Sequence, residues 1–143
     1  MHRRYADWFV KTVGMVLFIT GVAKILSGFG HARILAVPDP VIGLRFGMLM
    51  PIVGAAELVI AVTCFLPRVN ERLKFSLIAL LGINILVYRI GLWGIGWHHP
   101  CTCMGRLAGA LHLSDQAADN IMKGVLAYLL VGSCVLLFAQ GRR

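Results

Sequence analysis

The sequence predicts an all-α protein, a bundle of four transmembrane helices with the N- and C-termini in the cytoplasm. Hydrophobic residues make up 59% of the 143 residues and charged residues only 14%, whereas soluble domains carry about 25% charged residues. The mean hydropathy is +0.82. A helix needs about 20 apolar residues to cross the hydrocarbon core of a bilayer, so the length suits four spans within a single membrane domain over residues 1–143.

The membrane spans are expected over residues 8–27, 43–66, 73–94 and 119–139. The first apolar run follows basic residues, but it is too long for a signal peptide and no clear cleavage site follows it, so we expect it to be retained. Pro51 lies inside the second span and predicts a kink, which neighbouring helices can tolerate. Ser114 and Asp115 are candidate N-cap residues ahead of the fourth span.

The placement of basic residues predicts the orientation. Lys and Arg gather in the two tails and between the second and third spans, at Arg3, Arg4, Arg68, Arg72, Lys74, Arg142 and Arg143. Basic connections face the cytoplasm, so the loop at about 95–118 is expected in the periplasm, outside a bacterial inner membrane. The net charge of +8 forms no continuous basic stripe. It therefore favours contact with lipid headgroups and excludes nucleic acid as an expected partner.

The outer loop carries Cys101 and Cys103, separated by one residue and preceded by His98 and His99. Thiolates are the nucleophiles of disulfide exchange and soft ligands for metals. A disulfide between residues so close closes a small strained ring, which suits exchange better than stapling a fold. Cys101 and Cys103 are therefore the candidate catalytic residues. Metal binding is an alternative, because the same four residues, with His112, could supply ligands for zinc or copper.

Ionisable residues inside membrane spans are costly, so they are usually partnered or functional. At about 1.5 Å rise per residue, each span places one cation near its outer end: Lys24, Arg45, Arg89 and Lys123. Each alone is explained by snorkelling to the headgroups, whereas together they could favour a thiolate above them or hold an anion or a quinone. Glu57, near the middle of the second span, is expected to pair with a cation such as Lys11, to be neutral, or to relay protons. Cys64 and Cys134 lie in spans toward the cytoplasmic side and are expected to be core residues.

Several short motifs recur at corresponding places in a known family. They are Gly14-x3-Phe18-x2-Gly21-x2-Lys24, Ala56-Glu57-Leu58, Pro100-Cys101-Thr102-Cys103-Met104-Gly105 and Asn120. In these motifs the chain resembles the DoxX-like membrane proteins, and within them the MauE branch linked to methylamine utilisation. The resemblance implies a four-helix inner-membrane protein associated with redox chemistry and with thioredoxin-like partners. For the MauE branch it further implies support for maturation of the disulfide-rich small subunit of methylamine dehydrogenase.

The sequence thus predicts a redox-associated membrane protein that supports thiol–disulfide exchange or maturation of an exofacial partner, with a quinone as a candidate cofactor. Two alternatives stay open. The protein could be a non-enzymatic accessory subunit of a larger membrane complex, or its His/Cys loop could handle a metal.

Overall fold

The protein is an all-helical bundle, as the sequence predicts. The computed structural model describes residues 2–29, 33–96 and 114–141. The helices are α1 (His2–Gly28), α2 (Phe46–Phe65), α3 (Glu71–Gly94) and α5 (Asp115–Gly141), with a short 3-10 helix η1 (Arg33–Ala36) between α1 and α2. All four described α-helices are long and apolar enough to cross a membrane, which confirms the predicted all-α bundle of four membrane-spanning helices.

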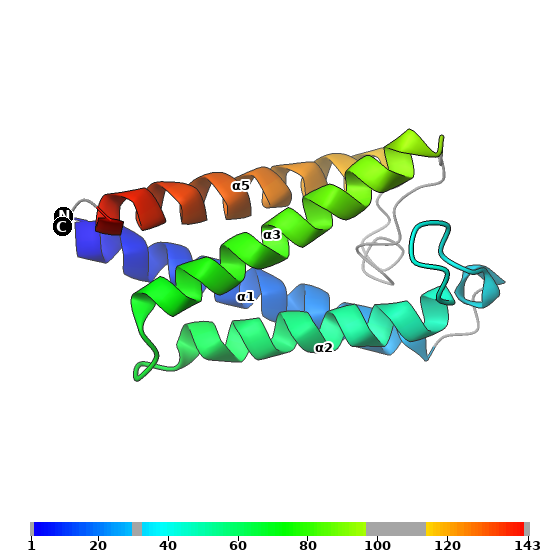
Figure 1. Ribbon diagram of the computed structural model, residues 1–143. Helices are drawn as coiled ribbons and strands as arrows, with labels where there is room; N and C mark the ends of the chain where they lie inside the picture. The colour runs from blue at the N-terminus through cyan, green and yellow to red at the C-terminus, as the bar shows by residue number, and fades with distance from the viewer. Residues whose placement is uncertain (1, 30–32, 97–113, 142–143) are drawn as a thin grey trace.

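Successive helices run in opposite directions (Figure 1). Both termini and the α2–α3 turn lie at one end of the bundle, here called the termini end. The connection that contains η1 lies at the other end, here called the η1 end. The helix α3 therefore ends at the η1 end, and α5 begins there.

The helices extend beyond the predicted spans where local chemistry allows. Hydropathy detects only the part of a helix that lies in hydrocarbon. This is why α1 begins at His2 whereas the predicted span begins at residue 8. At the start of α5, Ser114 Oγ accepts a hydrogen bond from Ala117 N at 3.3 Å, which confirms Ser114 as an N-cap. The second span instead starts late, at Phe46, because a tight turn with Gly43 at φ 78° occupies the residues before it.

The closest helix packing is between α1 and α2, and it depends on glycines. Gly14, Gly21 and Gly28 are spaced seven residues apart on α1, a period that keeps them on one helix face. A Cβ at Gly21 would lie 2.8 Å from the carbonyl oxygen of Gly54 on α2, and a Cβ at Gly54 would lie 2.7 Å from that of Gly21. Small residues let membrane helices approach until their backbones touch, and these positions have no room for a side chain.

The core between the four helices is apolar and continuous. Its buried residues include Val13 and Leu17 from α1, Ala61 from α2, Phe75 and Ile78 from α3 and Leu129 from α5. The outer faces of α3 and α5 are much less covered by the rest of the bundle than α1 is. In a membrane those faces meet lipid or another protein.

Polar contacts close the termini end. Asn70 caps α3 by accepting from Arg72 N at 3.1 Å. Lys74 is buried, and its Nζ donates to the carbonyl oxygen of Cys64 at 3.0 Å. That carbonyl belongs to the last turn of α2, where carbonyls lack a helical partner and attract cations. Lys74 thus joins α3 to the end of α2.

The prediction that both intramembrane cysteines are core residues is right for Cys64 and wrong for Cys134. Cys64 is buried between α1 and α2, where its Cβ faces Gly14. Cys134 is exposed on the surface of α5. An apolar residue can face either lipid or core in a membrane protein, so hydropathy does not distinguish the two.

Candidate functional site

A buried ion pair joins α1 to α2. Lys24 Nζ of α1 donates to Glu57 Oε1 of α2, and the two side chains are only 5% and 2% exposed. The second carboxylate oxygen, Oε2, accepts from Thr20 Oγ1 at 3.0 Å. Burial of one charge without its partner is costly, whereas a hydrogen-bonded pair offsets much of that cost. The glycine contact between α1 and α2 brings the two charges together inside the bundle.

Glu57 pairs with Lys24 and not with Lys11, the cation suggested by the sequence. Lys11 is exposed, whereas Lys24 points into the α1–α2 contact. Lys24 follows Gly21 and Thr20 by one helical turn, so these three residues share the face of α1 that meets α2. Both carboxylate oxygens of Glu57 are engaged, an arrangement that suits a structural partner.

A second charge cluster joins α3 to α5. Arg89 donates to Asp119 Oδ1, and Lys123 Nζ lies 2.7 Å from Asp119 Oδ2. The Arg89 side chain is mostly buried and that of Lys123 is exposed. Two cations share one carboxylate, so the cluster keeps an excess positive charge. Asp119 is not among the site residues expected from the sequence, although its spacing of four residues from Lys123 is typical of a helical ion pair.

The four cations predicted near the outer ends of the spans therefore do not share one environment. Within the described chain, contacts bring together Arg89 and Lys123 through Asp119, while Lys24 is neutralised by Glu57 inside the α1–α2 pair. Arg45 is exposed just before α2, where its carbonyl oxygen accepts from the first turn of that helix.

A buried carboxylate anchors the α1–α2 connection at the η1 end. Asp39 is 1% exposed. Its Oδ1 accepts from the backbone nitrogens of Val41 and Ile42 at 2.9 and 2.8 Å, and its Oδ2 accepts from the hydroxyl of Tyr88 on α3. Aspartate commonly bonds backbone nitrogens two or three residues ahead in turns, and the sequence Pro38-Asp39-Pro40 is such a turn signal. The contact with Tyr88 has no local sequence signal, because the residues lie 49 positions apart.

Replacement of Tyr88 by phenylalanine is expected to destabilise the protein by about 1.5–3 kcal/mol, the usual contribution of a hydrogen bond to a charged group. Asp39 would keep its backbone partners, so the turn should persist while its attachment to α3 weakens. Thermal unfolding in micelles, with limited proteolysis of the connection at residues 33–45, would measure both effects. Tyr128→Phe is the control, because it removes a hydroxyl that contacts Thr12 at an exposed position. Equal effects of the two changes would contradict the anchoring role of Asp39.

The remaining predicted site residues lie outside the described part of the chain. These are His98, His99, Cys101, Cys103 and His112. On either side of them in the chain, α3 ends and α5 begins at the η1 end. Cys64 and Cys134 lie toward the termini ends of their helices. Among the described residues, no group of three or more His, Cys, Asp or Glu residues could hold a metal ion.

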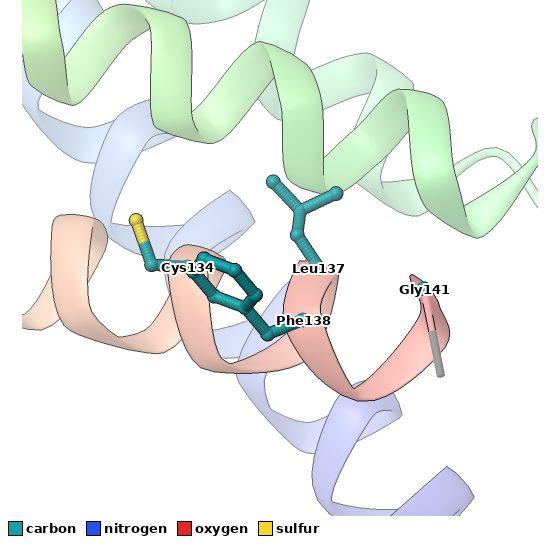
Figure 2. A pocket seen from close by; sticks show the side chains of 4 residues that line it. All are labelled: Cys134, Leu137, Phe138 and Gly141. Atoms are coloured by element: carbon teal, nitrogen blue, oxygen red, sulfur yellow. The ribbon is translucent and has the colours of Figure 1, made fainter. Parts of the chain in front are cut away.

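An apolar groove of about 430 Å³ lies on α5 near the termini end. It is lined by Cys134, Leu137, Phe138 and Gly141, which follow one another along one side of the helix (Figure 2). The lining has no charged side chain, and the groove is at the opposite end of the helix from the Arg89, Asp119 and Lys123 cluster. An acyl chain suits such a surface better than a polar cofactor does.

Fold and site together define a small multi-pass membrane protein in which one ion pair joins α1 to α2 and another joins α3 to α5. Comparison with protein-family models, with curated proteins and with solved structures finds no match to this chain.

Proposed function

We propose that the protein is a membrane-bound redox protein in which Cys101 and Cys103 exchange disulfides with an exofacial partner. The observation that supports this proposal is the place of the pair in the chain. Its segment connects two membrane-spanning helices and is attached to both at the η1 end. In this proposal the pair lies outside the bilayer, where a protein partner can reach it.

The exchange has two steps. A thiolate of the reduced partner attacks one sulfur of the Cys101–Cys103 disulfide, which forms a mixed disulfide and releases the other cysteine as a thiolate. The partner's second thiolate then attacks the partner's own sulfur in the mixed disulfide and releases the remaining cysteine. At the end the partner carries a disulfide, and Cys101 and Cys103 are thiols. A second exofacial disulfide or a quinone must then accept two electrons and two protons, because Cys64 and Cys134 lie toward the opposite end of the bundle.

The charge at the η1 end supports this chemistry. The Arg89, Asp119 and Lys123 cluster carries an excess positive charge, and the exposed Arg45 lies at a similar depth in the membrane. These charges favour anions at this end of the membrane. A thiolate, an anionic ligand or a reduced quinone would be stabilised there. Lys24 contributes less to that field, since Glu57 neutralises it.

The resemblance to DoxX-like and MauE-like proteins points to the same chemistry. On that basis the membrane is a bacterial inner membrane, the η1 end faces the periplasm, and the partner is a thioredoxin-like or disulfide-rich protein. Maturation of a protein such as the small subunit of methylamine dehydrogenase is the corresponding role. The basic residues at the termini end favour this orientation.

Alkylation of intact cells, followed by mass spectrometry, tests the proposal. Cys101 and Cys103 are expected to interconvert between a disulfide and two thiols with the redox state of the medium. Single Cys101→Ser or Cys103→Ser variants are expected to trap a mixed disulfide whose partner can be identified. Cys134→Ser is the matched control, because this exposed thiol lies toward the other end of the bundle.

The other outcomes separate the alternatives. Cysteines that stay reduced in oxidising medium would contradict disulfide exchange. Zinc or copper that purifies in stoichiometric amount, and is lost when His98 and His99 are replaced, would instead support a metal-handling loop. Assembly and activity of a larger complex that survive replacement of both cysteines by serine would support an accessory subunit.

A further inference from the structure

Asn84 places an amide on the outer surface of α3 in the middle of the membrane. Its side chain is exposed, between Leu80 and Val87, which are 57% and 61% exposed. At 1.5 Å per residue, Asn84 lies roughly 20 Å from the start of α3 and about 15 Å from its end. This depth is near the centre of a hydrocarbon core about 30 Å thick.

The helix can satisfy only part of this amide. Asn84 Nδ2 donates to the carbonyl oxygen of Leu80 at 2.8 Å. The second Nδ2 hydrogen and the acceptor Oδ1 have no hydrogen-bond partner among the described residues. Thr63 is different, because its one hydroxyl hydrogen is donated to Val59 O at 2.7 Å within its own helix. A carboxamide has two donor hydrogens and an acceptor, and lipid supplies no partner for the groups that remain.

We propose that the outer face of α3 binds α3 of a second copy of this chain, with Asn84 paired to Asn84 across a twofold axis. Copies inserted in the same orientation carry this residue at the same depth. Because a carboxamide both donates and accepts, two of them satisfy each other. Asparagine side chains hydrogen-bond across membrane helices in this way. A different membrane protein would need its own polar group at this depth, whereas a second copy supplies it by symmetry.

The rest of the face suits a helix pair. Leu73, Leu77, Leu80, Asn84 and Val87 follow one another at alternating intervals of four and three residues. This is the spacing of the contact line between two helices that cross in a left-handed pair, where a single asparagine fixes register and the number of chains. In a twofold dimer of parallel chains, the η1 ends of both copies face the same side of the membrane. The inference does not depend on the proposed redox function.

Energy transfer between donor-labelled and acceptor-labelled copies in phosphatidylcholine vesicles tests the dimer over a range of protein-to-lipid ratios. The wild-type chain is expected to dimerise. Asn84→Leu is expected to weaken dimerisation by roughly 3- to 30-fold, the effect of losing interhelical hydrogen bonds in a membrane. Asn84→Gln keeps the carboxamide and should retain most of the association. Val131→Leu is the matched control, since it changes an exposed apolar residue on α5.

Circular dichroism checks that each variant keeps its helices, and Asn84 is exposed, so the bundle core is untouched by these changes. Wild-type chains that stay monomeric at every ratio would overturn the proposal and leave this face to lipid or to another membrane protein. Dimers that Asn84→Leu does not weaken would overturn it too, because they would use another face.

Discussion

Replacement of Glu57 by leucine is expected to lower the free energy of unfolding by about 3–5 kcal/mol, the usual cost of leaving one member of a buried ion pair alone. Lys24 would remain 4% exposed in an apolar contact with no counter-charge. Thr20 could not compensate, since its hydroxyl can donate to Glu57 but offers a lysine only a neutral acceptor. Reversible unfolding in mixed micelles, followed by circular dichroism, measures the change.

The double variant Glu57→Leu/Lys24→Leu separates loss of charge balance from loss of packing. Apolar replacement of a whole buried ion pair is often neutral or stabilising, so the second change should restore most of the stability that the first removes. Glu71→Gln is the control, because Glu71 is exposed at the termini end and its carboxylate contacts Gln140 at 3.3 Å. A double variant as unstable as Glu57→Leu alone would show that shape, and not charge, dominates this site.

Replacement of Gly21 by leucine is expected to destabilise the protein by about 3 kcal/mol or more, at the upper end of the range for overpacked cores. The new Cβ would meet the backbone of Gly54 at 2.8 Å and Leu58 at 3.0 Å. Backbone atoms cannot yield by changing rotamer, so α1 and α2 would have to separate. That separation would also pull Lys24 away from Glu57. The same unfolding measurement in micelles applies.

Gly124→Leu provides the matched control for this change. A Cβ at Gly124 meets nothing within 4 Å, and the position is exposed on α5. The same residue exchange there is expected to be neutral or slightly stabilising, because leucine has a higher helix propensity than glycine. Similar losses at both positions would contradict the close α1–α2 contact as the cause.

The fold was predictable because it depends on hydropathy, which is a local property of the chain. Four apolar runs imply four helices, whichever of these helices pack against one another. The Lys24–Glu57 pair was not predictable in the same way, since it requires knowledge of which helices touch and how each is rotated. Lys11 and Lys24 are equally plausible partners from depth and composition alone. The seven-residue spacing of Gly14, Gly21 and Gly28 is the sequence signal that identifies the face of α1 on which the partner lies.

Two other features were harder to foresee for different reasons. The bond between Asp39 and Tyr88 joins a turn to a helix that follows much later, and neither residue has a local pattern that identifies the other. Cys134 could not be assigned to core or surface, because lipid and protein interior select the same side chains. The candidate cysteines are the reverse case. The chemistry proposed for them rests on residue type and spacing alone, and no tertiary contact enters it.

The two ion pairs that join helices in the described part of the chain have a consequence for biogenesis. Lys24 and Glu57 belong to the first two spans, whereas Arg89 and Asp119 belong to the last two. Each half of the chain can therefore form its own interhelical ion pair as it enters the bilayer, without a contribution from the other half. Because polypeptides emerge from the N-terminus, the α1–α2 hairpin can insert with Lys24 paired to Glu57, and the α3–α5 hairpin can follow with Arg89 paired to Asp119.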